Sequence, residues 1–263
     1  MGLPFRPIKR LGQHFLVDPN TARRIVAALK ASRMDSVVEI GPGTGALTEL
    51  LLERFERVVA VEVDARAATY LRNTYPDLTL LEQDVLEWGW LDCGSPPLHV
   101  IGNLPYNITS PVVLSLLDVR EILAEAVFMM QLEVAKRLVA SPRTKAYGIP
   151  SVLAQVYSRP TLLFKVSRNV FVPKPAVESA VVRLDFAEAT APEVHVGRLR
   201  GVLRRAFGTR RKMLHNCFQA WTRPAGVTLP EKWARARAEE LSPADYVQLT
   251  QYFLEVLPAN SRH

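Results

Sequence analysis

The feature that most constrains this chain is a glycine-rich turn between a β-branched run and an amphipathic stretch. Residues 37–40 (Val-Val-Glu-Ile) have the composition of a buried strand, and Gly-Pro-Gly-Thr-Gly follows directly at 41–45. Alternate glycines let the backbone turn tightly and approach a ligand closely, because they carry no side chain and tolerate positive φ. The run predicts a strand, a ligand-binding turn and a helix start. A strand-to-helix turn without a ligand is the alternative.

The same alternation continues along the chain. Helix-like stretches at 46–55 and 65–73 separate the first β-branched runs. The further runs lie at 58–63, 78–81, 98–101, 126–130, 161–166 and 180–184. This order predicts an α/β, Rossmann-like sheet of seven mostly parallel strands with helices on both faces, in which the last two runs close one edge. Ligands of such sheets bind beyond the carboxyl ends of the strands.

The composition changes after Phe186. A linker rich in small residues occupies 187–193, and the rest of the chain has helical rather than strand periodicity. The formal net charge of the 263 residues is +7, which favours an anionic partner such as nucleic acid or an acidic membrane surface. Basic residues without one acidic residue crowd 196–215. The strongest phosphate-binding candidates there are Arg204, Arg205, Arg210, Arg211 and Lys212.

Several protein classes are disfavoured. Cys93 and Cys217 are the only cysteines, too few and too far apart for a disulfide framework or a zinc site. The chain has no apolar run near the roughly 20 residues that a membrane span needs, and residues 1–12 lack the apolar core of a signal peptide. We therefore expect a cytoplasmic protein without a metal or a membrane partner. A monomer is expected as well, although none of these features bears on the oligomeric state.

Acidic residues at strand ends suggest which cofactor is bound. Gly41, Gly43 and Ala46 also satisfy a dinucleotide fingerprint, and Glu62, after the second strand, could accept from ribose hydroxyls of either cofactor. A nicotinamide-dependent oxidoreductase is therefore an alternative, although no His or Lys constellation supplies its proton donor. Asp84, after the third strand, could accept from an adenine amine or could simply cap a helix.

Glu39 adds a carboxylate just before the glycines, where it would lie near a positive sulfonium. Together with Glu62 and Asp84, it favours S-adenosyl-L-methionine as the cofactor.

The fourth strand leads into Asn103-Leu104-Pro105-Tyr106, the most specific chemical signal in the chain. An exocyclic adenine amine is a poor nucleophile, because its lone pair is delocalised into the ring. The Asn103 side-chain carbonyl and the Leu104 main-chain carbonyl could hold its hydrogens and favour a pyramidal nitrogen. Pro105 stiffens the turn and removes an N–H donor, and Tyr106 would stack on the target base. Catalysis would then be chiefly positioning; a plain turn is the alternative.

A second aromatic residue lies in the proline-containing segment 171–179. Its prolines fix an extended loop that could present Phe171 to the same base. Burial of Phe171 in the core is the alternative, and the sequence does not decide between the two.

These residues resemble the KsgA-type small-subunit ribosomal RNA adenine dimethyltransferases over nearly the whole chain. The matching segments are 11–16, 39–45, 103–106, 171–179, 206–207 with 210–212, and 237–242. The linker after Phe186 divides the chain into domains at 1–187 and 188–263. The resemblance implies that the first is a class I methyltransferase catalytic domain and the second a helical RNA-binding domain. It also implies that His14 and Leu16 contact the cofactor together with Gly41, Glu62, Asp84 and Asn103, and that Tyr106 and Phe171 sandwich the adenine. The family often has Asn where His14 stands.

Members of this family dimethylate the N6 amines of two adjacent adenosines near the 3′ end of small-subunit (16S) rRNA, in the immature 30S subunit. Erythromycin-resistance methyltransferases of large-subunit rRNA share the glycine loop but commonly carry Ile where this chain has Leu104. They are one alternative. A DNA adenine methyltransferase and a non-catalytic RNA chaperone or assembly factor are the others.

Overall fold

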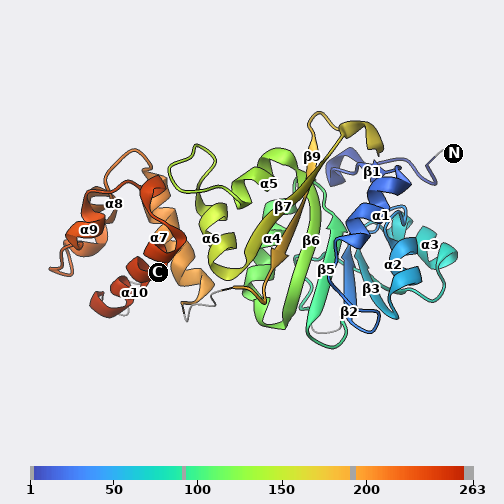
Figure 1. Ribbon diagram of the computed structural model, residues 1–263, viewed down its shortest axis with the longest axis horizontal. Helices are drawn as coiled ribbons and strands as arrows, with labels where there is room; N and C mark the ends of the chain where they lie inside the picture. Colours follow the sequence, from blue (N-terminus) through green and yellow to red (C-terminus); the bar gives the residue numbers. More distant parts are fainter. Residues whose placement is uncertain (1–2, 91–92, 190–193, 258–263) are drawn as a thin grey trace. The chain divides into compact units, whose positions relative to one another are not determined.

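The chain forms two compact units. The computed structural model describes residues 3–90, 93–189 and 194–257 (Figure 1). Unit 1 comprises Met1–Ala135 and Pro160–Ala187, and unit 2 comprises Lys136–Arg159 and Glu188–His263.

Unit 1 is built on a seven-stranded sheet. Its strands are β2 (Ser36–Ile40), β3 (Arg57–Glu62), β4 (Thr79–Glu82), β5 (Leu98–Asn103), β6 (Leu123–Gln131), β7 (Arg159–Val166) and β9 (Ser179–Asp185). They lie in the order β4-β3-β2-β5-β6-β9-β7. The first five are parallel, and β9 runs antiparallel to β6. The predicted Rossmann-like sheet is confirmed, including the two late strands at one edge.

Helices and a small second sheet complete unit 1. The helices are α1 (Pro19–Ala27), α2 (Thr48–Arg54), α3 (Ala65–Thr74), α4 (Thr109–Asp118) and α5 (Leu132–Leu138). The last residues of α5 belong to unit 2. The 3-10 turns are η1 (Lys9–Leu11), η2 (Arg120–Ile122) and η3 (Arg168–Val170). Strand β1 (Phe15–Leu16) pairs antiparallel with β8 (Phe171–Val172), so the N-terminal segment is tied to the segment before β9.

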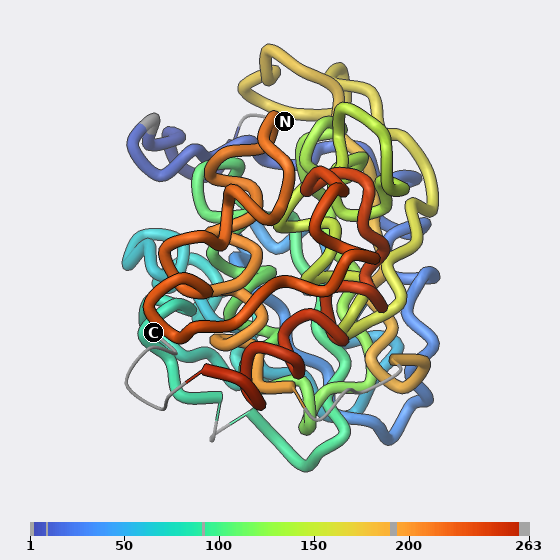
Figure 2. The backbone as a smooth tube through the Cα atoms, turned by 90° about the vertical axis from the view of Figure 1, so that its left-hand side faces the viewer, coloured from blue at the N-terminus to red at the C-terminus, as the bar shows by residue number. Residues whose placement is uncertain are grey.

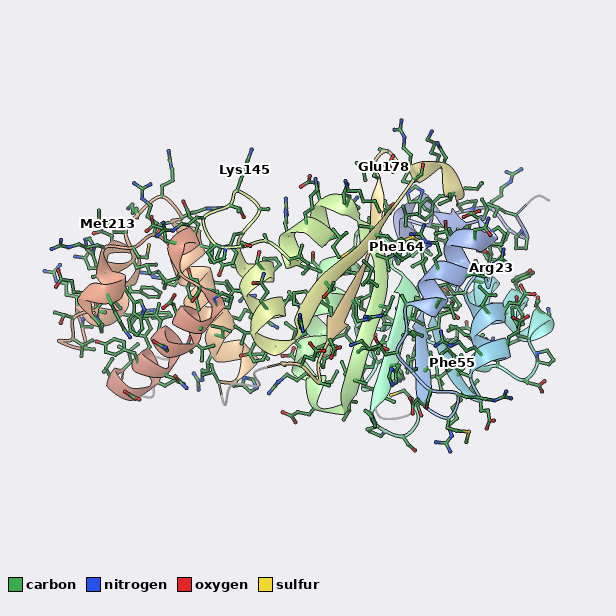
Figure 3. The ribbon with its side chains drawn as sticks, in the orientation of Figure 1. Arg23, Phe55, Lys145, Phe164, Glu178 and Met213 are labelled. Atoms are coloured by element: carbon green, nitrogen blue, oxygen red, sulfur yellow. The ribbon has the colours of Figure 1, made fainter. Side chains whose placement is uncertain are left out.

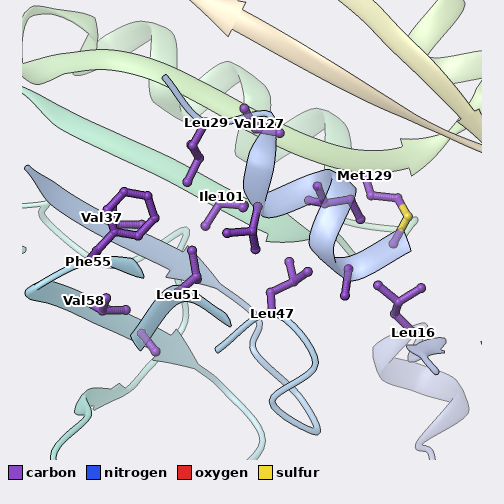
Figure 4. Packing of buried hydrophobic residues seen from close by; sticks show 14 of the residues in the cluster. Leu16, Leu29, Val37, Leu47, Leu51, Phe55, Val58, Ile101, Val127 and Met129 are labelled. Atoms are coloured by element: carbon purple, nitrogen blue, oxygen red, sulfur yellow. The ribbon is translucent and has the colours of Figure 1, made fainter. Parts of the chain in front are cut away.

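The core of unit 1 lies between the sheet and helices α1 and α2. Leu51 of α2 packs in one cluster with Val37 of β2 and Ile101 of β5 (Figure 4). Leu51 is fully buried, so its truncation to Ala would cost about 2–5 kcal/mol of stability. The next residue of β2, Val38, is equally buried. Because successive strand residues face opposite sides, both faces of the sheet are covered, as is typical of parallel sheets.

Unit 2 is helical. It contains α6 (Ile149–Tyr157), α7 (Val196–Gly208), α8 (Leu214–Thr222), α9 (Glu231–Ala234), the 3-10 turn η4 (Ala238–Glu240) and α10 (Pro243–Val256). Helix α6 contacts α7 and α10, and α7 contacts α8; Figure 2 shows α7 to α10 in orange and red. Tyr157 bonds through its hydroxyl to the Val194 carbonyl at 2.7 Å, which ties α6 to the start of the later helices.

The sequence placed residues 136–159 with the first domain, whereas they belong to unit 2. Val152, Leu153 and Val156 give α6 a buried apolar face, and α7 and α10 cover it. Periodicity reveals such a face but not its partner. Among the described helices, none has the length and apolar character of a membrane span.

Candidate functional site

A cavity of about 160 Å³ lies in unit 1, where the parallel strands β2, β3 and β5 end. Eleven of the residues singled out from the sequence line it: His14, Leu16, Glu39, Gly41, Gly43, Glu62, Asp84, Asn103, Leu104, Pro105 and Tyr106. They come together because parallel strands present their carboxyl ends at the same edge of a sheet.

The glycine turn forms one wall of this cavity. Gly41 and Gly43 have φ of +65° and +57°, which L side chains rarely adopt. A Cβ on Gly43 would also lie 3.0 Å from the Phe15 ring. The Gly43 N–H donates to Glu62 Oε2 at 3.0 Å, so the turn is fastened to the end of β3. The backbone is therefore exposed to a ligand without an intervening side chain.

Three carboxyl groups line the cavity, and no Lys or Arg of the described chain is among its lining residues. Glu39 is buried and accepts from Thr48 Oγ1 at 2.7 Å. Burial raises the pKa of Glu39 to about 8, and the neighbouring Glu62 charge adds to the effect. Burial also raises the pKa of Glu62, against backbone hydrogen bonds from Asp64 and Gly43. A positive charge bound beside these groups would favour their carboxylate forms, so the cavity suits a cationic ligand better than an anionic one.

Asp84 caps a turn and also lines the cavity. Its Oδ1 accepts from the Leu86 N–H at 2.9 Å, which caps the following turn, and the half-buried side chain also lines the cavity. Val63 lines the cavity as well and is 53% exposed. The sequence reasoning did not single out Val63. An apolar residue directly after the strand-ending Glu62 was the signal that could have found it.

The Asn103–Tyr106 loop presents two hydrogen-bond acceptors. Asn103 Nδ2 donates to the His14 main-chain carbonyl at 3.0 Å, so the amide oxygen is the atom left to accept from a ligand. The Leu104 N–H donates to the Met129 carbonyl at 3.1 Å and holds the loop to β6. Within the described residues, no donor pairs with the Leu104 carbonyl oxygen. This pair of acceptors suits an amine with two hydrogens.

Tyr106 lies beside His14. The two ring centroids are 5.4 Å apart and the rings are tilted by 31°. The Tyr106 hydroxyl is 2.8 Å from Ser179 Oγ, and burial raises the pKa of Tyr106. The phenol therefore stays neutral at physiological pH and offers an uncharged ring for stacking.

Phe171 is not among the residues that line the cavity. It is buried in the core of unit 1 and faces Leu16 in the β1–β8 ladder, while Val172 is exposed. The alternation of side chains in the short strand β8 turns Phe171 inward. The structure places the Phe171 side chain in the core, and its contact with the target base stays a prediction.

Gln13 is a further residue that sequence reasoning did not assign. Its amide donates to Asp64 Oδ2 at 2.8 Å and accepts from the Ile8 N–H at 2.8 Å. The Arg66 guanidinium beside Asp64 lowers the pKa of that carboxyl to about 2, so Asp64 is ionised. Gln13 thereby anchors the N-terminal segment to the end of β3. Its position one residue before His14 was the available signal.

The five predicted phosphate ligands of unit 2 fall into two groups. Arg205 Nε donates to the Cys217 carbonyl at 2.8 Å, and Arg210 bonds to Glu239 Oε2 at 2.9 Å and to the Thr144 carbonyl at 3.1 Å. These two side chains stabilise unit 2 itself. The other three predicted phosphate ligands, which are exposed, are Arg204, Arg211 and Lys212.

Unit 2 also contains a larger cavity, of about 510 Å³. Arg204, His195 and Trp221 are among the residues that line it, and no Asp or Glu of the described chain does.

Figure 3 labels Lys145, which extends from the loop between α5 and α6. In the described part of the chain, no group of three or more His, Cys, Asp or Glu could hold a metal ion.

Comparison with known proteins relates the chain to one family. A family model described as ribosomal RNA adenine dimethylase matches residues 5–255. The chain is 49% identical to "Ribosomal RNA small subunit methyltransferase A" of Salinibacter ruber over 256 residues, 96% of this chain and 86% of that protein. It is 42% identical to the protein of the same name from Chlorobium phaeobacteroides, covering 95% of this chain and 94% of that protein.

Solved structures show the same fold. A dimethyladenosine transferase from Plasmodium falciparum superposes with a TM-score of 0.79 at 24% identity, covering 92% of this chain and 98% of that one. The 23S rRNA methyltransferase ErmE superposes with a TM-score of 0.64 at 26% identity, covering 90% and 98%. On the family match and the curated relatives, the chain belongs to the ribosomal RNA adenine dimethylase family and is a methyltransferase.

Proposed function

We propose that the chain transfers methyl groups from S-adenosyl-L-methionine to the N6 amines of two adjacent adenosines near the 3′ end of small-subunit (16S) rRNA. The pair of acceptors at Asn103 Oδ1 and the Leu104 carbonyl is the observation that carries the proposal. The name shared by the Salinibacter and Chlorobium relatives supports the small subunit as the source of the RNA.

The cavity suits the proposed methyl donor. Bound there, the donor would supply an electrophilic methyl group on a positive sulfonium. Glu39 would face that charge, Glu62 would accept from the ribose hydroxyls, and Asp84 would accept from the adenine amine. Gly41 and Gly43 would let the backbone approach the ligand. A nicotinamide coenzyme suits the cavity less well, because its phosphates carry negative charge and no Lys or Arg of the described chain lines the cavity.

The acceptors would act on the target amine. Hydrogen bonds from both amine hydrogens to Asn103 and Leu104 would favour a pyramidal geometry at the nitrogen. The nitrogen lone pair would then be less delocalised into the adenine ring. The nitrogen becomes acidic as it is alkylated, so its proton can pass to water and no strong base is needed. After the first transfer one N–H remains, and one acceptor suffices to orient it for the second. Positioning of this kind can account for several orders of magnitude in rate.

A transfer assay tests the proposal. Small subunits from cells that lack the enzyme are incubated with labelled cofactor, and the modified nucleotides are mapped. We expect label at two adjacent adenosines near the 3′ end of 16S rRNA. We expect Asn103→Ala to reduce the rate about 100-fold or more, and Asn73→Ala, an exposed asparagine of α3, to leave it unchanged. An undiminished rate for Asn103→Ala would refute the mechanism. Label confined to 23S rRNA would point to the large-subunit alternative.

We further propose that unit 2 binds the phosphates of this RNA in the immature 30S subunit, through Arg204, Arg211 and Lys212. All three are exposed and lie on or just after α7. Replacement of all three by Gln should reduce the slope of log affinity against log salt by roughly one for each phosphate that is no longer neutralised. Equal affinity and equal slope would contradict this role. Binding of RNA by an inactive protein with no affinity for the cofactor would instead support an assembly factor.

A further inference from the structure

We propose that segment 171–179 is a positioning element for the methyl-transfer loop, acting on Tyr106 through Ser179 and through His14. The inference rests on the proposed function, because it takes Tyr106 as the residue that stacks on the target base. It gives the segment a role that does not require the Phe171 ring to face the cavity.

Ser179 holds one end of the tyrosine. It is the first residue of β9, is fully buried, and faces Gln131 in the antiparallel ladder with β6. Its position is therefore fixed by the main sheet. Its Oγ lies 2.8 Å from the Tyr106 hydroxyl oxygen. Glu178, the residue before it, is labelled in Figure 3 where the segment enters β9.

His14 holds the tyrosine ring. Its Nδ1 is 2.7 Å from the Pro173 carbonyl oxygen. A carbonyl only accepts, so Nδ1 carries the hydrogen and the imidazole is oriented by the 171–179 segment. The same imidazole lies 5.4 Å from the Tyr106 ring, centroid to centroid. The next residue, Phe15, pairs with Val172 of β8. This backbone pairing fixes the position of His14 relative to segment 171–179.

His14 also connects the two parts of the methyl-transfer loop. Its main-chain carbonyl accepts from Asn103 Nδ2 at 3.0 Å, while its side chain contacts Tyr106. One residue thus sets both the amide that would hold the amine and the ring that would hold the base. The family resemblance assigned His14 to the cofactor. The contacts of its side chain point instead to the base.

A predicted consequence separates positioning from cofactor binding. Ser179 holds the Tyr106 hydroxyl, and His14 packs beside the Tyr106 ring. Together they fix the orientation of a base stacked on this ring relative to the methyl donor. In-line transfer is sensitive to that orientation. Removal of either interaction should lower kcat on RNA. It should leave the affinity for the cofactor unchanged, because neither interaction involves the carboxylates of the cavity.

A double-mutant cycle tests the Ser179 hydrogen bond. We expect Ser179→Ala and Tyr106→Phe each to lower kcat about three- to tenfold, the range of one hydrogen bond, with KM for the cofactor unchanged. The double variant should be no slower than Tyr106→Phe, because both changes remove the same bond. Ser115→Ala, a half-buried serine of α4 bonded within its own helix, is the control and should keep full activity. Multiplicative losses in the double variant would overturn the Ser179 part.

Three substitutions test the histidine. His14→Ala removes ring and donor, His14→Phe restores the ring, and His14→Asn restores a donor. Stacking is read from the fluorescence of 2-aminopurine at the target position, and cofactor affinity from calorimetry. We expect His14→Ala to lower kcat about tenfold and weaken the quenching of 2-aminopurine, with the Phe and Asn variants each recovering part. Weakened cofactor binding with unchanged kcat and quenching would overturn the proposal.

The two levels of proposal can fail separately. Absence of methyl transfer to 16S rRNA by the unaltered chain would refute the proposed function. Normal transfer by the unaltered chain, together with unaffected Ser179→Ala and His14→Ala variants, would overturn only the positioning role.

Discussion

The buried carboxyl of Glu39 should make the stability of unit 1 depend on pH. Burial raises the pKa of Glu39 from an ordinary 4.5 to about 8. Above pH 4.5 the unfolded chain releases this proton, whereas the folded chain keeps it until about pH 8. The free energy of unfolding therefore falls as pH rises through this window, by up to about 1.36 kcal/mol per pH unit. Over the window of about 3.5 pH units the loss is at most roughly 5 kcal/mol, since rearrangement around a buried charge reduces it.

Glu39→Gln removes this dependence while keeping an oxygen that can accept from Thr48. The assay is urea unfolding from pH 5 to pH 8. Trp88 and Trp90 report on unit 1 once the two tryptophans of unit 2 are replaced by Phe. We expect the free energy of unfolding of Glu39→Gln, measured relative to that of the unaltered chain, to increase as pH rises. At pH 8 this relative increase should reach several kcal/mol.

The titration of Glu62 is present in both proteins and largely cancels in the difference. Glu53→Gln, an exposed change on α2, is the matched control and should follow the unaltered chain. Parallel pH curves for Glu39→Gln and the unaltered chain would refute the reasoning. We also expect saturating S-adenosyl-L-methionine to flatten the curve, because a positive charge beside Glu39 favours its carboxylate.

Three further predictions concern substitutions in the glycine turn, in unit 2 and in the N-terminal segment. Gly43→Ala should weaken cofactor binding at least tenfold in calorimetry, because its φ of +57° and a Cβ only 3.0 Å from an aromatic ring would distort the turn; unchanged affinity would contradict this. Arg210→Ala should destabilise unit 2 by about 1–3 kcal/mol in urea, whereas Arg211→Ala should not, since Arg210 alone is bonded to Glu239 and the loop of Thr144; equal effects would count against this. Gln13→Ala should speed proteolysis of the N-terminal segment by releasing it from Asp64, and an unchanged cleavage rate would argue otherwise.

The sequence predicts the sheet and most of the cavity because both follow from local patterns. A parallel strand is buried on both faces, so its apolar run is visible, and the residue after it falls at a known edge. Glu62 and Asn103 could be placed together for this reason. The acidity of the cavity follows from the same positions.

What the sequence could not give depends on contacts between distant segments. Phe171 and Val172 are both apolar, and only the pairing of β8 with β1 decides which one faces the core. The bond between Tyr106 and Ser179 joins residues 73 positions apart. Arg210 and Arg211 are chemically alike, and only the fold brings Glu239 to the former.

The division of unit 2 between two stretches of chain limits how the protein can be shortened. A polypeptide ended at Ala187 would keep α6 but lose α7 and α10, which cover its apolar face. Val152, Leu153 and Val156 would then meet water, and such a surface promotes aggregation. Unit 2 thus consists of an insertion within unit 1, residues 136–159, and the C-terminal residues 188–263. The ribosome synthesises the insertion well before the C-terminal residues.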